Sequence, residues 1–409
     1  MIPLKKKIER KMGEKMKKQK KILIIPILIL IVILSSCCKT FAKDDSATIE
    51  LSEEYEKYLE LSDEEKEKVI EPLMYDIPKT SSKITSPLKV AKILKATVDA
   101  KYSLKDVIPA NMVIKNQQQT NSCWTFASLG MLESTLALMN YKNGINPIVY
   151  DFSERHMEYA TSDTFKDGTN KNGFHRKVDS GGNSNTFEAY LTNGTGAISE
   201  KEMPFENNID LIELSKIQNV NVITQLNDTI DFPTYKATDD KTQIKQQMKQ
   251  HISDYGGIYT QIYGSSLDNN ECYNNKTGAL YCDDDIKYQI NHAVLIVGWD
   301  DNYSKDNFLE NKKPQNNGAW IIKNSWGTEQ RYTLEEMKNF IFKQLPDKCA
   351  EYGWTSANMI PDEIAKKVFE ELGYTIENDE AVMNIGDNGF MYISYEDVNV
   401  YKNLYGITN

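Results

Sequence analysis

Asn-Gln-Gln-Gln-Thr-Asn-Ser-Cys-Trp-Thr-Phe-Ala, residues 116–127, is the stretch from which the predicted fold follows. An apolar run at helical spacing begins within it and stops at Lys142-Asn143-Gly144. Asn121 and Ser122 are both suitable N-cap residues, and glycine commonly follows the last turn of a helix. The pattern therefore predicts a helix whose first turn contains Cys123.

The position of Cys123 has a chemical consequence. Unpaired N–H groups and the helix dipole favour negative charge at a helix N-terminus, so we expect the pKa of the thiol to be lowered. The thiolate is the nucleophilic form of cysteine. An isolated cysteine is more often a small buried apolar residue, so the choice depends on the other residues of the chain.

His292 and Asn324 supply the partners that a nucleophilic cysteine needs. His292 precedes an apolar segment at 293–299, and Asn324 follows another at 319–323. If these segments are antiparallel neighbours, both side chains lie at the same edge of the sheet. The histidine would then accept the thiol proton and the asparagine would fix its tautomer. Trp326 would cover the hydrogen bond between them.

Gln117 could supply a donor for the oxyanion, which acyl transfer also requires. Its side-chain amide and the backbone N–H of Cys123 can donate to the oxyanion that forms when a carbonyl is attacked. Losing one such donor costs about 3 kcal/mol of transition-state stabilisation. Helical segments dominate the first part of the chain and strands the later part, which indicates an α+β fold with two lobes.

Together these segments resemble the papain-like cysteine protease family. The matching segments are 117–127, Gly181-Gly182, Asn291-His292-Ala293-Val294, Asn324-Ser325-Trp326-Gly327 and Asp387-Asn388-Gly389-Phe390. The resemblance implies a papain-like two-lobe fold, with a helical lobe, a β-rich lobe and the active-site cleft between them.

The resemblance also implies a role for each residue. Cys123 would be the nucleophile, His292 the base and acid, Asn324 its orienting partner and Gln117 the oxyanion donor. Substrate would be bound by Gly181, Gly182 and Trp326.

The sequence departs from the family pattern at two places. Thr120 stands where many members have a cysteine that is bonded to another cysteine ahead of the glycine pair, so that disulfide is missing. Residues 329–385 form an insertion where the family has only a few residues, and their apolar spacing predicts two amphipathic helices. The insertion could shape substrate access, bind a partner or merely decorate the fold.

The amino-terminal region, residues 1–43, has the pattern of an export signal. Residues 1–21 hold ten Lys or Arg and two Glu, and an aliphatic run at 22–34 follows. Leu34-Ser35-Ser36-Cys37 resembles the bacterial lipoprotein signal, in which the cysteine, here Cys37, becomes lipidated. Cleavage after Thr40-Phe41-Ala42 and an uncleaved anchor are the alternatives. All three place the body outside the cytoplasm, either tethered to the membrane at the cell surface or secreted.

The next region, residues 44–98, contains two short helical segments and an extended connector. It is either a linker or a propeptide ahead of a catalytic domain at 99–409.

Beyond residue 21 the chain has a net charge of −19, because the whole carries −11 and the first 21 residues carry +8. This acidic body argues against nucleic-acid binding.

Cys272 and Cys282 flank a turn-like segment, so they could form a hairpin disulfide or remain two thiols. Zinc-ligand spacing is absent, and we expect no metal or cofactor.

The sequence thus predicts a monomeric cysteine endopeptidase that hydrolyses proteins through a thioester acyl-enzyme at the bacterial cell surface. The alternatives are a catalytically idle surface binding module or adhesin, and an aminopeptidase or acyl transferase.

Overall fold

The computed structural model describes residues 52–66, 99–169, 174–206, 208–226, 228–236, 238–264, 271–283 and 287–408. The chain divides into two compact units, Met1–Glu50 and Leu51–Asn409. The expected signal segment, the lipidation site Cys37 and most of the expected propeptide lie outside the described residues. Within the described residues, no helix is both long and apolar enough to cross a membrane.

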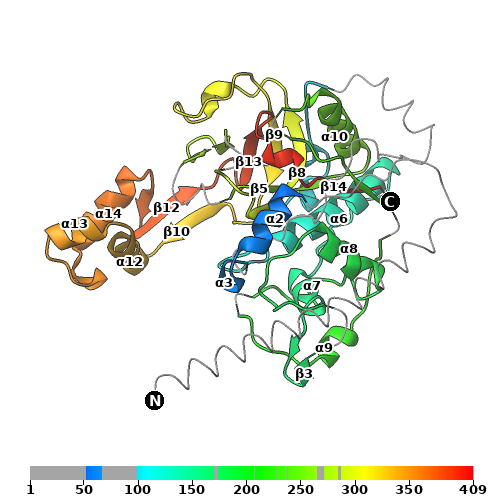
Figure 1. Cartoon of the computed structure of the whole chain (residues 1–409), viewed down its shortest axis with the longest axis horizontal. Coiled ribbons are helices and arrows are strands. Elements are labelled where there is room, and N and C mark those ends of the chain that lie inside the picture. The colour runs from blue at the N-terminus through cyan, green and yellow to red at the C-terminus, as the bar shows by residue number, and fades with distance from the viewer. Residues whose placement is uncertain are drawn as a thin grey trace, which may run out of the picture. The chain divides into compact units, whose positions relative to one another are not determined.

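The helices and strands follow the order expected for an α+β fold (Figure 1). The helices are α2 (Glu53–Glu60), α3 (Asp63–Lys66), α5 (Leu104–Val107), α6 (Cys123–Lys142), α7 (Glu154–Ala160), α8 (Ser184–Thr192), α9 (Ser215–Gln218), α10 (Thr242–Asp254), α12 (Leu334–Gln344), α13 (Pro346–Glu351) and α14 (Asp362–Glu371), with short 3-10 turns η1 (Pro109–Asn111), η2 (Lys305–Asn307), η3 (Ala357–Met359) and η4 (Asn399–Tyr401). The strands are β1 (Lys101–Ser103), β2 (Thr164–Phe165), β3 (Gly168–Thr169), β4 (Thr229–Asp231), β5 (Ile258–Ile262), β6 (Tyr273–Asn274), β7 (Ala279–Leu280), β8 (His292–Asp300), β9 (Ala319–Lys323), β10 (Glu329–Tyr332), β11 (Thr375–Glu377), β12 (Glu380–Asn384), β13 (Phe390–Ser394) and β14 (Tyr405–Ile407).

Helix α6 is the buried helix that the opening stretch predicted. Most of its surface is buried, because apolar and small residues surround it on all sides. A side chain added at Gly130 would contact Leu295, so α6 packs against β8. The helix ends at Lys142, and Gly144 follows in the left-handed conformation with φ of 67°.

The main sheet has the strand order β4-β14-β5-β8-β9-β13-β7-β6, and β1 pairs with β8. Strands β8 and β9 are antiparallel neighbours, as predicted, with Leu295 opposite Lys323. Their register shifts between Ile296 and Gly298, where a side chain on Gly298 would clash with the backbone of β1. This pairing brings the start of β8 and the end of β9 to one edge of the sheet.

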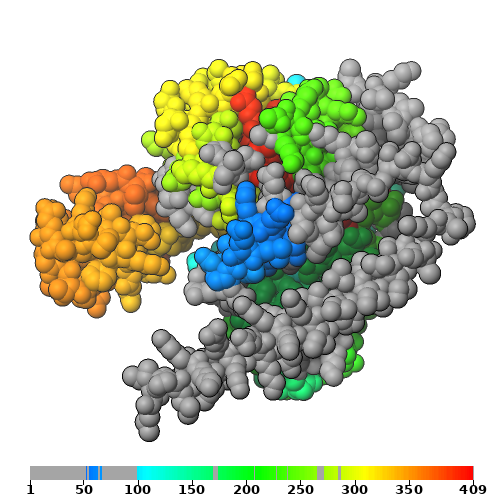
Figure 2. Space-filling view, in the orientation of Figure 1, coloured from blue at the N-terminus to red at the C-terminus, as the bar shows by residue number. Residues whose placement is uncertain are grey.

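The insertion is a small folded unit with its own sheet and core. Strands β10, β12 and β11 form a separate antiparallel sheet. Helices α12 and α14 coincide with the two predicted amphipathic helices, and Thr333 and Glu336 form a capping box at the start of α12. Figure 2 shows the insertion, in orange, as one continuous packed lobe. The core consists of Met337, Ile341, Cys349, Ile360, Ala365, Phe369 and Ala381.

The two short helices predicted near the start of the chain are also present. Ser52 caps α2 by accepting a hydrogen bond from the backbone N–H of Tyr55. Ser62 and Glu65 exchange hydrogen bonds around the start of α3, which is the arrangement of a capping box. Each of the two helices therefore begins at a side chain that accepts from its backbone.

Candidate active site

Cys123 is the first residue of α6 and is 5% exposed. Its sulfur accepts a hydrogen bond of 3.4 Å from the backbone N–H of Ala293. Ala293 is the second residue of β8 and directly follows His292. The structure therefore brings the thiol from the helical part of the chain to the histidine's end of the sheet.

His292 and Asn324 meet at the sheet edge as the strand pairing predicts. His292 Nε2 lies 2.8 Å from Asn324 Oδ1, and both side chains are buried. The ring of Trp326 stacks on the imidazole, with 4.3 Å between ring centroids and an interplanar angle of 19°. This contact shields the hydrogen bond and holds the imidazole in one plane. With Nε2 committed to Asn324, Nδ1 is the nitrogen available for proton exchange.

Asn324 is itself held by its neighbours. Its Oδ1 also accepts a 2.8 Å bond from the backbone N–H of Ser325, and its Nδ2 lies 3.1 Å from the sulfur of Met391 in β13. The sequence offered no role for Ser325 or Met391. Ser325 belongs to a matched motif and Met391 to a predicted strand, but their contacts depend on how β9 and β13 pair.

Gln117 is buried and fixed by the segment that carries Asn324. Its backbone N–H donates to the Ser325 carbonyl at 2.7 Å, and its Oε1 accepts from the Ser325 hydroxyl at 2.7 Å. Its Nε2 donates one hydrogen to the Thr120 carbonyl at 2.8 Å. An amide nitrogen carries two hydrogens, so one remains for another acceptor.

The ionisation states differ from the sequence expectation. Burial raises the pKa of the Cys123 thiol to about 11, although the backbone N–H groups of Ala293, Trp124 and Cys123 oppose the shift. Burial also lowers the pKa of His292 to about 4, against the opposing effect of its bond to Asn324. The expectation of a lowered thiol pKa was wrong, because burial of the sulfur raises its pKa by more than the backbone N–H groups at the helix start lower it.

The glycine pair lies beside α6. A side chain on Gly182 would overlap the indole of Trp124, so only glycine permits this approach. The guanidinium of Arg176 lies 4.7 Å from the Trp124 ring and donates to the Gly181 carbonyl at 3.0 Å. Arg176 thus fixes the glycine loop against the residue that follows Cys123.

A polar contact ties the two loops where the family disulfide is missing. The backbone N–H of Asn121 donates to Asp179 Oδ1 at 2.7 Å, and Asn121 Nδ2 donates to the Asp179 carbonyl at 3.1 Å. The Thr120 hydroxyl instead bonds to the Gln117 carbonyl and to Ser122. Hydrogen bonds between residues 121 and 179 therefore connect the cysteine loop to the glycine loop.

Cys272 and Cys282 lie at the ends of the β6–β7 hairpin and are not joined by a disulfide. The backbone of the two flanks is paired, because the Tyr281 N–H donates to the Cys272 carbonyl at 3.1 Å. A disulfide between Cys272 and Cys282 stays a prediction.

Comparisons with known proteins agree with this geometry. The sequence model of the papain family cysteine proteases matches residues 98–332, which is more than half of the chain. Cysteine proteinase 2 of Entamoeba histolytica is 24% identical over 216 residues, covering 53% of this chain and 56% of that protein. The viral cathepsin of Epiphyas postvittana nucleopolyhedrovirus is 27% identical over 217 residues, covering 53% and 52%. The chain thus spans about half the length of the curated relatives it matches.

Solved structures show a similar fold. The crystal structure of the cysteine protease and lectin-like domains of Cwp84, a surface layer associated protein of Clostridium difficile, has a TM-score of 0.59 and 24% identity, and covers 88% of this chain and 60% of that chain. The clostridial cysteine protease Cwp84 after propeptide cleavage has a TM-score of 0.52 and 25% identity, and covers 76% and 58%. By its α+β fold and by the family match across most of its body, the chain belongs to the papain family of cysteine proteases.

Proposed function

We propose that the protein is a cysteine endopeptidase that hydrolyses peptide bonds of proteins through a thioester acyl-enzyme. The observation that carries the proposal is a pair of hydrogen bonds. His292 Nε2 lies 2.8 Å from Asn324 Oδ1, and the backbone N–H of Ala293, the residue after His292, donates to the Cys123 sulfur. A thiol, an imidazole and an orienting amide in this order are the parts that acyl transfer requires.

The reaction begins with proton transfer from the Cys123 thiol to His292 Nδ1. The sulfur attacks the carbonyl carbon of the scissile bond, and the carbonyl oxygen becomes an oxyanion. The second Nε2 hydrogen of Gln117 and the backbone N–H of Cys123 donate to that oxygen. Collapse of the tetrahedral intermediate breaks the C–N bond, and the imidazolium gives its proton to the leaving amine.

The thioester is then hydrolysed by the reverse use of the same groups. Neutral His292 removes a proton from water, which attacks the thioester carbonyl. The acid leaves and the sulfur recovers its proton. Asn324 holds the imidazole in the tautomer that both steps need, because its Oδ1 accepts from Nε2–H throughout.

Gly181 and Gly182 present backbone groups beside Cys123, and we assign them to the extended substrate backbone. Trp326 covers His292 and borders the leaving-group side of the scissile bond. The close packing of Trp124 on Gly182 supports this assignment, because it places the glycine backbone against the first turn of α6.

The location of the enzyme belongs to the same proposal. A basic and then aliphatic leader at 1–43 supports export, and Cys37 is the proposed lipidation site. Residues 44–98 are the proposed propeptide, since the family match begins at residue 98. The surface layer association of Cwp84 supports a place at the bacterial cell surface.

An internally quenched peptide with a blocked amino terminus tests the reaction. We expect cleavage by the native chain and none by Cys123→Ala. Cleavage that requires a free amino terminus would indicate an aminopeptidase, and transfer to an added amine would indicate an acyl transferase. Binding without any cleavage would indicate an idle module. A thiol-trapping epoxide should modify one residue, Cys123, in peptide mapping.

Fatty-acid labelling tests the tether. We expect label on the native chain expressed in a bacterial host and none on Cys37→Ala. Label that survives the substitution would exclude lipidation at that residue.

A further inference from the structure

The glycine loop, residues 177–182, is held by the arginine that precedes it. Arg176 Nη1 donates to the Thr161 hydroxyl at 2.7 Å. Its Nη2 donates to the Gly181 carbonyl at 3.0 Å and also to the Ser180 carbonyl. These bonds come from two nitrogens of one rigid plane, an arrangement of donors that a lysine ammonium does not have. A single side chain therefore fixes the direction of two successive carbonyls of the loop.

Thr161 gives this contact a fixed base. It is the C-cap residue of α7 and is fully buried. Its hydroxyl donates to the Met157 carbonyl of α7 at 2.8 Å while it accepts from Arg176, so both functions of the hydroxyl are used. The guanidinium therefore joins the glycine loop to the end of α7.

The same guanidinium contacts α6 through Trp124. Its carbon lies 4.7 Å from the centre of the ring, which is within the range of a cation–π interaction. Among the described residues the Trp124 Nε1 has no hydrogen-bond partner, so packing holds the indole. A Cβ atom on Gly182 would lie 2.5 Å from the same ring. Arg176 and the glycine loop thus contact one indole, directly after Cys123 in the first turn of α6.

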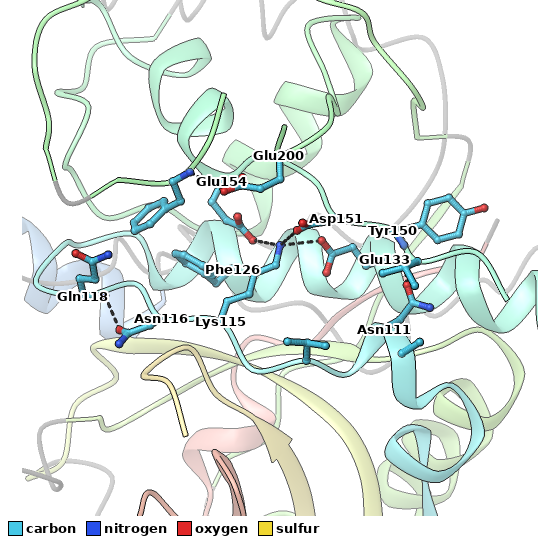
Figure 3. A pocket seen from close by; sticks show the side chains of 14 residues that line it. Asn111, Lys115, Asn116, Gln118, Phe126, Glu133, Tyr150, Asp151, Glu154 and Glu200 are labelled. Carbon is cyan, nitrogen blue, oxygen red and sulfur yellow. Dashed lines mark hydrogen bonds and ion pairs between the residues drawn. The ribbon is translucent and has the colours of Figure 1, made fainter. Parts of the chain in front are cut away.

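A second contact ties the glycine loop to the cysteine loop, residues 116–122. The cysteine loop is closed at its start, because Asn116 Oδ1 accepts from the backbone N–H of Gln118 at 2.8 Å on the wall of the pocket in Figure 3. At its other end the backbone N–H of Asn121 donates to Asp179 Oδ1 at 2.7 Å. The glycine loop is therefore held at two places, where the family disulfide is missing.

We propose that Arg176 is a positioning residue for substrate binding. It holds the backbone of Gly181 and Gly182 where an extended substrate backbone can pair with it. The inference rests on the proposed function, which assigns these two glycines to the substrate. A loop that contacts the substrate equally in the ground state and in the transition state contributes uniform binding, so its displacement raises KM and leaves kcat unchanged.

Cleavage of the quenched peptide by Arg176→Met tests the inference. Methionine keeps an unbranched stem beside Trp124 but donates no hydrogen bond. We expect KM to rise about tenfold, because hydrogen bonds from a charged donor are lost, and kcat to stay within about twofold. Arg176→Lys keeps the charge without the planar donors, so its KM should lie between those of the native chain and Arg176→Met.

Two controls separate positioning from other effects. p-Nitrophenyl acetate acylates a reactive thiol but has no peptide backbone to pair with the glycines, so its hydrolysis by Arg176→Met should stay within about twofold of the native rate. Lys166→Met removes one positive charge from an exposed residue and should leave KM unchanged. Thermal unfolding shows whether each variant is folded.

Three results would overturn the proposal. The first is an unchanged KM in both Arg176 variants. The second is ester hydrolysis that falls as far as kcat/KM on the peptide, because a general structural role predicts equal losses. The third is an equal rise of KM in Lys166→Met, which would show that charge alone is responsible. If Arg176→Met does not unfold cooperatively, Arg176→Lys decides, and its KM must exceed the native value.

Peptide binding keeps this inference distinguishable from the peptidase activity. If the native chain cleaves no peptide, the proposed function fails, and calorimetry with the same peptide on Cys123→Ala, with and without Arg176→Met, decides the inference. Affinity about tenfold weaker with Arg176→Met supports it. Equal affinity of the two chains, or no binding to either, overturns it.

Discussion

Cys123 and His292 are each pushed toward the neutral form by burial, which raises the pKa of the thiol to about 11 and lowers that of the imidazole to about 4. The neutral pair becomes reactive only when the proton passes from sulfur to Nδ1. Attraction between the resulting charges then offsets part of the cost of burying them. In the proposed mechanism the histidine is therefore needed to form the thiolate as well as to protonate the leaving group.

His292→Ala should accordingly shift the pH dependence of Cys123 alkylation. Without the imidazole, thiolate forms only as the pH approaches the raised thiol pKa of about 11, so the rate with iodoacetamide should rise tenfold per pH unit from pH 7 to 10. The native chain should react readily at pH 7. Stopped-time alkylation with mass spectrometry measures both profiles. Equal rates at pH 7 would show that His292 does not take the thiol proton.

Asn324→Ala should slow turnover without preventing alkylation. The substitution removes the acceptor for His292 Nε2, and a buried hydrogen bond of this kind is worth about 1–3 kcal/mol, or about five- to 150-fold in kcat. Steady-state kinetics on the quenched peptide, beside the iodoacetamide rate at pH 7, measures both properties. Unchanged kcat would remove Asn324 from the mechanism.

Sequence reasoning predicted which residues of the proposed site lie together but not the direction of their pKa shifts. Cys123, His292 and Asn324 each stand at the end of a recognisable helix or strand, so strand pairing was enough to predict that His292 and Asn324 meet. The sign of the Cys123 pKa shift depends on how completely the sulfur is enclosed, which one chain position cannot reveal. The bond from Asn121 to Asp179 was also unpredictable, because the residues lie 58 positions apart on loops.

At the scale of elements, the insertion is the part in which the structure differs most from the prediction made from the sequence. The spacing of apolar residues predicted α12 and α14 but not β10, β11, β12 or α13. These strands are three to five residues long and carry many charged side chains, so their alternation was too short to recognise. The pairing of Ile385 N–H with the Thr328 carbonyl at 2.9 Å closes the base of the insertion.

Removal of the insertion should leave the catalytic body folded. Glu329 lies opposite Asn384, so replacing residues 330–383 with Asn-Gly would close a two-residue hairpin at its base. The insertion has a core of its own, and the body should keep cooperative unfolding. Cleavage of the short quenched peptide should stay within tenfold of the native chain, which is about 1.4 kcal/mol.

Protein substrates separate the possible roles of the insertion. Equal loss of short-peptide and protein cleavage would show that the insertion supports the active site itself. Loss of protein cleavage alone would indicate a role in substrate access or docking. No change for either substrate would mean that the insertion is dispensable for both reactions. Circular dichroism and thermal unfolding of the deletion variant provide the folding control.

At the scale of the whole molecule, the partly buried Glu200 links folding to pH. The pKa of Glu200 is raised to about 8, mainly by burial, whereas a glutamate in the unfolded chain titrates near 4.3. Between these values the folded chain keeps a proton that the unfolded chain has lost. This group therefore lowers stability as the pH rises through that window, and its effect is complete above pH 8.

Glu200→Gln should remove this contribution. Gln remains neutral and retains the acceptor for Phe205 N–H, so the variant should gain stability relative to the native chain as the pH rises from 6.5 to 8. A fully buried carboxyl would contribute about 1.4 kcal/mol per pH unit, and screening of the partly buried Glu200 reduces this to about 0.5 kcal/mol. Urea unfolding at pH 6.5, 7.2 and 8.0 measures the difference. A constant difference across this range would show that Glu200 titrates near its ordinary pKa.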